Sequence, residues 1–144
     1  MTSRIHPTRT IVNVPDGMQP MTLARLVADR VSRHPDARVA TVFVARDGRR
    51  QQRMEDVLKA MMPGHVILSL PAWDCLPYDR VSPNAVTLAA RMTTLSALAG
   101  GGVKGAVILT TVNAAIQKLP PREVVAQMSF AATAGQVVDS DRLV

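Results

Sequence analysis

Residues 66–83 read VILSLPAWDCLPYDRVSP, and this stretch decides how the rest of the chain is interpreted. Residues 66–70 form a short apolar run of the kind that makes a buried strand. The segment from Pro71 to Pro83 follows at once, with three prolines and the only Trp, Cys and Tyr of the chain. Because α/β proteins build their binding sites beyond the carboxyl ends of buried strands, the stretch predicts such a fold with a candidate site in this loop.

The remainder of the chain alternates apolar runs with segments of helical periodicity. The strands expected are residues 9–14, 39–45, 66–70 and 106–111, with 129–133 as an edge strand. The helices expected are residues 21–33, 48–62, 83–99, 112–118 and 122–127. The run 39–45 is apolar throughout, which is typical of a strand covered on both faces. This order predicts three layers, with a parallel sheet between helices on both of its faces.

Local signals indicate where two of the helices begin and which side chains they bury. Asp47 is expected to cap the second helix, and Ser82 with Pro83 is expected to open the third. The apolar positions expected to face the core are Met54, Val57, Leu58 and Met61 in the second helix, and Leu88, Met92, Leu95 and Leu98 or Ala99 in the third. The opposite face of the second helix carries Arg49, Arg50 and Arg53, which we interpret as a solvated face, with a partner-binding patch as the alternative.

Composition excludes several classes of protein. Apolar residues make up 47% of the 144 residues, which indicates a folded domain. No apolar run approaches the roughly 20 residues that span a bilayer, and the amino terminus lacks the apolar core of a secretory signal. We therefore expect a soluble, cytoplasmic protein without a membrane partner. The single cysteine, Cys75, cannot form an internal disulfide, and no Cys/His cluster has zinc spacing, so no metal site is expected.

The net charge of +6 suits contact with a polyanion. The basic residues are nevertheless dispersed along the chain, and aromatic side chains on which bases could stack are scarce. Solvated arginines on helix faces are therefore the favoured interpretation, and a weak nucleic-acid-binding module is an open alternative.

Three motifs follow one another along the chain. They are Trp-Asp-x-Leu-Pro-Tyr-Asp-x-x-Ser-Pro from Trp73, the helical segment Arg-Met-Thr-Thr-Leu from Arg91, and the strand and turn of residues 106–114. In this order they resemble the amino-terminal region of bacterial transcription-repair coupling factors (Mfd), which is related to the first domain of the excision-nuclease subunit UvrB. The resemblance implies an α/β domain of the P-loop NTPase type over residues 9–135. Residues 1–8 are expected to be a disordered tail, and residues 136–144 to begin a further module.

The UvrB domain carries a phosphate-binding loop between its first strand and its first helix. Such a loop needs glycines, a lysine for the terminal phosphates and a Ser or Thr for magnesium. The corresponding residues 14–22 read VPDGMQPMT, with Gly17 as the only glycine, no Gly-Lys-Ser/Thr, and Pro20 in place of one amide. We therefore expect a degenerate phosphate loop near Gly17, with no catalytic residue and no cofactor in this chain. The resemblance implies that ATP and magnesium bind to a translocase farther along the full-length protein.

The loop after the third strand contains the candidate contacts to neighbouring domains or partners. These candidates are Trp73, Tyr78, Asp79 and Arg80. The alternative is that Trp73 and Tyr78 only cover the core. UvrB begins its DNA-gripping hairpin at this place, but here few residues separate Tyr78 from the next helix, so direct recognition of damage is not expected. Asp74 and Asp79 are expected to cap turns or to pair with Arg80.

The resemblance implies a scaffold without catalytic activity in a larger protein. That protein displaces stalled RNA polymerase from damaged DNA with ATP and recruits nucleotide excision repair through UvrA. The partners implied are the remaining domains of the same protein and, through the full-length protein, UvrA, RNA polymerase and DNA. The alternative is a free-standing enzyme or nucleotide-binding α/β domain that uses the loop from Pro71 to Pro83 as its site.

Overall fold

Three parallel strands form the centre of the computed structural model, which describes residues 10–35, 40–75, 80, 82–101 and 104–129. The strands are β1 (Thr41–Ala45), β2 (Ile67–Leu70) and β3 (Val107–Thr111), and they pair in the order β1-β3-β2. The register aligns both Phe43 and Ser69 with Leu109. Strand β3 is therefore central, and all of its residues are buried.

The helices expected from the sequence are present, with shifts of a few residues at their ends. Helical elements of the described residues are η1 (Asp16–Met18), α1 (Gln19–Arg33), α2 (Gly48–Met61), α3 (Ala85–Ala99), α4 (Val112–Ala115) and α5 (Arg122–Met128). Among the described residues, no helix has the length and apolar character to cross a bilayer. The expected tail 1–8, most of the expected edge strand 129–133 and the expected further module 136–144 lie outside these residues.

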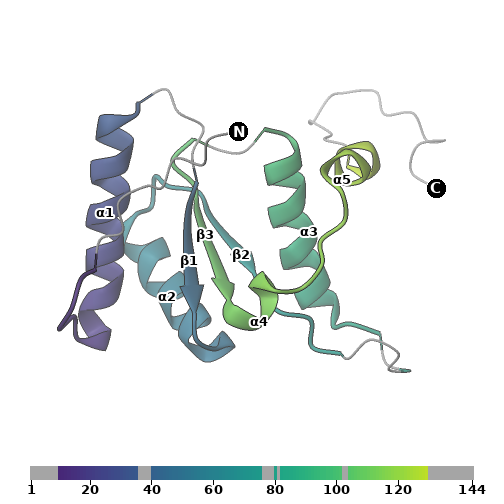
Figure 1. Cartoon of the computed structure of the whole chain (residues 1–144), viewed down its shortest axis with the longest axis horizontal. Helices are drawn as coiled ribbons and strands as arrows, with labels where there is room; N and C mark the ends of the chain where they lie inside the picture. The colour runs from purple at the N-terminus through teal and green to yellow at the C-terminus, as the bar shows by residue number, and fades with distance from the viewer. Residues whose placement is uncertain (1–9, 36–39, 76–79, 81, 102–103, 130–144) are drawn as a thin grey trace.

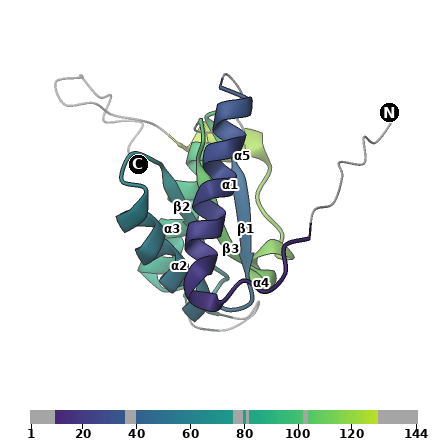
Figure 2. The same cartoon turned by 90° about the vertical axis from the view of Figure 1, so that its left-hand side faces the viewer.

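Helices cover the sheet from two sides (Figure 1). Helices α1 and α2 lie on one side, and α3 and α5 lie on the other; Figure 2 shows α1 running along the outside of the first layer. Because successive residues of a strand face opposite ways, β3 contributes to both layers. Leu109 packs with Leu58 of α2 on the first side, and Ile108 packs with Leu95 of α3 on the second. The chain is therefore an α/β protein with a small parallel sheet, as predicted.

Strand β1 lies at an edge of the sheet, so the prediction that it is covered on both faces is wrong. Val42 is 57% exposed and Val44 is 48% exposed. Both lie on the α3 side, because Val42 is aligned with Ile108, but α3 packs over β2 at the opposite edge. An apolar run indicates a strand, but it does not tell where in the sheet that strand lies.

Residues 10–14 do not form the first strand that was predicted for residues 9–14. Asn13 has a φ of +59°, which interrupts any extended run. Ile11 and Val12 are exposed and pair with no strand of the described structure. From residue 10 onward, helix α1 is therefore not preceded by a strand of this sheet, and the P-loop-like character of the fold remains a prediction.

Helix α2 begins as predicted, whereas α3 begins later than predicted. The carboxylate of Asp47 accepts a hydrogen bond from the backbone N–H of Arg50 at 2.8 Å, which is the predicted cap. Helix α3 is capped by Asn84, whose side-chain oxygen accepts from the backbone N–H of Val86 at 2.8 Å. The prediction that Ser82 and Pro83 open this helix is therefore wrong, because α3 begins at Ala85, directly after the cap Asn84.

The apolar stripes of α2 and α3 are only partly buried. In α2, Met54 and Leu58 are buried, but Val57 and Met61 are exposed. In α3, Leu95 is buried, but Leu88 and Met92 are exposed, and Arg91 and Thr94 occupy the buried positions instead. The predicted core face of α3 is therefore rotated toward two polar residues. Thr94 donates a hydrogen bond to a carbonyl at the carboxyl end of β2, and Arg91 donates one to the carbonyl of the residue after this strand.

Candidate functional site

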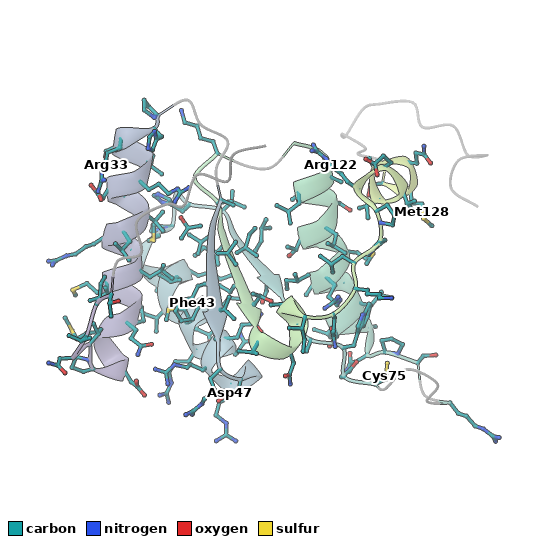
Figure 3. All side chains as sticks on the ribbon, in the orientation of Figure 1. Arg33, Phe43, Asp47, Cys75, Arg122 and Met128 are labelled. Carbon is teal, nitrogen blue, oxygen red and sulfur yellow. The ribbon has the colours of Figure 1, made fainter. Side chains whose placement is uncertain are left out.

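The two regions singled out by the sequence lie at one end of the molecule. Because the strands are parallel, the residues that follow β1 and β2 emerge at the same edge of the sheet. Asp47 follows β1 and Cys75 follows β2, and both lie at this lower edge in Figure 3. Two arrangements of side chains are found here, a buried arginine behind the loop and a basic pocket at the start of α1 and α2.

Arg91 of α3 fixes the start of the loop from inside. Its side chain is 1% exposed. Its Nη1 donates to the carbonyl oxygen of Pro71 at 2.5 Å and to Oε1 of Gln117 at 3.3 Å. Its guanidinium carbon lies 4.3 Å from the ring centroid of Trp73, which is cation–π geometry. One buried cation thus joins α3, the loop and the segment after α4.

The groups that contact the buried charge of Arg91 in the described structure are neutral. Burial lowers the pKa of Arg91 below its ordinary value, but an arginine remains protonated at any physiological pH. No carboxylate of the described residues forms an ion pair with it, and its Nε has no hydrogen-bond partner among them. Backbone and amide oxygens, together with the Trp73 ring, therefore compensate the buried charge within the described structure.

Further hydrogen bonds hold the end of β2 and the residues after it. Gln117 Oε1 also accepts from the backbone N–H of Trp73 at 3.2 Å. The hydroxyl of Thr94 donates to the carbonyl of Ser69 at 2.6 Å, and the hydroxyl of Thr110 donates to that of Leu70 at 2.9 Å. The backbone entering the loop is thus fixed from α3, from β3 and from the residues after α4.

The structure describes only two of the four residues that were predicted to contact neighbouring domains or partners. Trp73 is half-buried against Arg91, and Arg80 is exposed. Tyr78 and Asp79 lie outside the described residues. Asp74 accepts from the backbone N–H of Asn84 at 3.3 and 3.2 Å through its two carboxylate oxygens, which joins it to the start of α3. Because the two residues are ten positions apart, this contact is not a turn cap, and the predicted turn-capping or pairing with Arg80 stays a prediction. That these residues contact neighbouring domains or partners remains a prediction.

The sequence reasoning missed Arg91 as a member of the site. A signal was present, because Arg91 lies three residues after Leu88 and four before Leu95, on the stripe expected to be buried. Gln117 gave no comparable signal, since nothing in its neighbourhood distinguishes it from an exposed polar residue.

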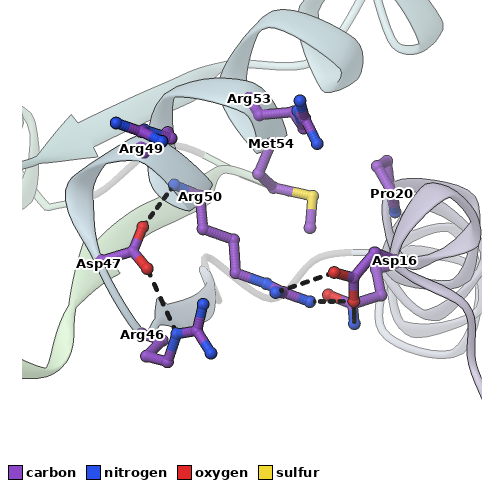
Figure 4. A pocket seen from close by; sticks show the side chains of 9 residues that line it. Asp16, Pro20, Arg46, Asp47, Arg49, Arg50, Arg53 and Met54 are labelled. Carbon is purple, nitrogen blue, oxygen red and sulfur yellow. Dashed lines mark hydrogen bonds and ion pairs between the residues drawn. The ribbon is translucent and has the colours of Figure 1, made fainter.

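The second arrangement is a polar pocket of about 300 Å³ between the start of α1 and the start of α2 (Figure 4). It is lined by Asp16, Gln19, Pro20, Arg46, Asp47, Arg49, Arg50, Arg53 and Met54. The guanidinium of Arg50 donates to both carboxylate oxygens of Asp16, at 3.2 and 2.6 Å. Arg46 donates to Asp47 at 3.3 Å. Arg49 and Arg53 form no ion pair with any carboxylate of the described residues.

The pocket favours negative charge. The hydrogen bond from Arg50 and then its charge lower the pKa of Asp16, and the charges of Arg46 and Arg53 lower it further. The pKa of Asp47 is also lowered, first by the backbone N–H of Arg50 and then by Arg46. Both carboxylates are therefore ionised at neutral pH in a setting that the arginines dominate.

The region of the predicted degenerate phosphate loop borders this pocket. Gly17 lies in η1 and does not line the pocket, whereas Asp16 and Gln19 do. A phosphate loop would contribute a lysine and a hydroxyl at this place, and neither is among the lining residues. Within the described structure, no three His, Cys, Asp or Glu side chains come together as a metal site.

The fold and these two arrangements define a small α/β module whose polar features gather at the carboxyl edge of a parallel sheet. No protein-family model matches the chain. The chain is similar to the transcription-repair-coupling factor of Escherichia coli (strain K12), with 27% identity over 120 residues. The match covers 83% of this chain and 10% of that protein, so the chain spans about a tenth of the length of the relative that it matches. This similarity supports a relationship to the coupling factors.

Proposed function

We propose that this chain is a scaffold module, without catalytic activity, of a transcription-repair coupling factor. The observation that carries the proposal is the similarity to the Escherichia coli protein over 83% of the chain. A match of this extent includes the middle of the chain, where the segment from Pro71 to Pro83 lies. The buried anchor formed by Arg91 gives the start of that segment a structural task, because it contacts Pro71 and Trp73.

The full-length protein, in this proposal, displaces stalled RNA polymerase from damaged DNA and recruits excision repair through UvrA. The module described above holds the neighbouring module that contacts UvrA and helps to keep the full-length protein inhibited. Trp73, Tyr78, Asp79 and Arg80 form its contacts to those neighbours. ATP and magnesium act in the translocase, outside this chain.

The pocket supports the absence of nucleotide chemistry here. Asp16 places a carboxylate at the start of α1, where a phosphate loop would offer amides and a lysine to a triphosphate. That carboxylate and Asp47 both accept hydrogen bonds from arginine, so a metal ion at this place would lie beside cationic side chains. The degenerate phosphate loop is therefore the form of this site that we propose.

Steady-state turnover of magnesium-ATP by the purified chain tests the proposal against a free-standing nucleotide enzyme. We expect phosphate release equal to that of the buffer alone, because a scaffold module of this kind would neither activate water nor hold the metal. Asp16→Ala and Asp74→Ala serve as matched variants, since they remove the carboxylates nearest to the two candidate sites. Turnover by the natural chain that either variant abolishes would refute the scaffold assignment. Turnover that all three proteins share would contradict the scaffold assignment as well, because the reaction would then depend on other residues of the chain.

A further inference from the structure

The basic pocket carries an excess of positive charge that the scaffold role does not require. Four arginines and two aspartates line it, which leaves an excess of two positive charges. Arg49 and Arg53 are exposed and have no carboxylate partner in the described residues. Arginines that are unpaired and face a cavity are available to an anion that comes from outside the chain.

The arrangement of the arginines suits a chain of phosphates. Arg49 and Arg53 are one turn apart on α2, so that their side chains emerge roughly 6 Å apart along the helix axis. Arg46 precedes α2 and donates to Asp47, and Arg50 donates to Asp16. Arg49 and Arg53 therefore provide the guanidinium groups without a carboxylate partner in the described residues, and a guanidinium binds phosphate oxygens in a bidentate manner.

The composition of the lining distinguishes among phosphate ligands. It contains no aromatic side chain on which a base could stack, and no lysine or hydroxyl for a metal-bound triphosphate. The contacts on offer are therefore to backbone phosphates and carry no sequence preference. We propose that the pocket between η1–α1 and α2 binds the phosphodiester backbone of DNA.

Asp16 acts as an internal competitor in this site. Its carboxylate already occupies Arg50 at 2.6 Å, in the manner in which a phosphate oxygen would. The depressed pKa of Asp16 keeps this competitor charged at neutral pH. DNA binding is therefore weak in the natural chain and becomes tighter when this charge is removed.

Fluorescence anisotropy with a labelled oligothymidylate, at about 50 mM salt and then at rising salt, tests the proposal. The double variant Arg49→Gln/Arg53→Gln removes two pocket arginines and lowers the net charge from +6 to +4. The matched control Arg25→Gln/Arg30→Gln makes the same change of charge on α1, at exposed positions that do not line the pocket. Glutamine keeps a helix propensity close to that of arginine, so both variants should fold, which circular dichroism verifies.

Three results are expected. The pocket variant binds DNA at least about 10-fold more weakly, and its slope of log K against log salt falls by about 1.4, because two phosphate contacts are lost. The control variant loses less than about 3-fold, since only long-range attraction is reduced. Asp16→Asn binds severalfold more tightly than the natural chain, because Arg50 is freed.

Equal losses in the two double variants would overturn the proposal, since they indicate attraction by net charge alone. No DNA binding by the natural chain at the lower salt would overturn it as well. So would a polyglutamate peptide that binds the natural chain as tightly as DNA and depends equally on Arg49 and Arg53, because the pocket would then be a carboxylate site. None of these outcomes bears on magnesium-ATP turnover, so the scaffold proposal is tested separately.

Discussion

Replacing Arg91 by alanine is expected to lower the free energy of unfolding by about 3 kcal/mol. The substitution removes a side chain that is 1% exposed and leaves a cavity beneath Trp73. It also takes the donor away from the carbonyl of Pro71 and from Oε1 of Gln117. A buried acceptor without a partner costs about 1–3 kcal/mol, and the lost packing adds to this.

Urea unfolding, followed by far-ultraviolet circular dichroism and by fluorescence, measures this effect. Because Trp73 is the only tryptophan, its emission reports directly on the anchor, and we expect a red shift in folded Arg91→Ala as water reaches the ring. Arg91→Met refills the volume but restores no hydrogen bond, so it should recover only part of the loss. Met92→Ala is the matched control on the same helix, at a residue that is 38% exposed, and should cost less than about 1 kcal/mol. A loss in Arg91→Ala no larger than in this control would show that the anchor is not structural.

Replacing Leu58 by alanine is expected to cost about 3–4 kcal/mol. Leu58 is fully buried between α1 and the sheet, in one cluster with Val27, Val107 and Leu109. Its neighbour Val57 belongs to the same apolar stripe in the sequence but is 36% exposed. Val57→Ala should therefore cost less than about 1 kcal/mol, and the higher helix propensity of alanine offsets part of that. Equal losses at the two positions in urea unfolding would contradict the packing described above.

The order of the elements was largely predictable because it depends on local pattern. Strand β3 and helix α1 follow from an apolar run and from helical periodicity, and the cap at Asp47 follows from a single residue type. The edge position of β1 was not predictable, because it depends on which strands lie beside it. The apolar run near Ile11 was misinterpreted as a strand because the apolar pattern outweighed Asn13, although asparagine is among the few residue types besides glycine that adopt a positive φ readily.

The candidate site was predictable in place but not in detail. The run of prolines after β2 located the loop, and the parallel order of strands located the edge of the sheet. The contacts that build the site connect distant residues, such as Trp73 with Gln117, which are 44 positions apart, and Asp16 with Arg50, which are 34 apart. Pattern reasoning works within one element, so it could not pair them. Arg91 was passed over because a charged residue on a helix usually faces solvent.

The scaffold proposal is tested most directly by measuring the binding of UvrA to a chimeric coupling factor. In the chimera, this chain replaces the matching segment of the Escherichia coli protein, and a second protein lacks that segment altogether. If the chain is a scaffold that holds the UvrA-contacting module in place, the chimera binds UvrA with the affinity of the parent, whereas the shortened protein binds more weakly. A folded chimera that binds UvrA no better than the shortened protein would contradict the account.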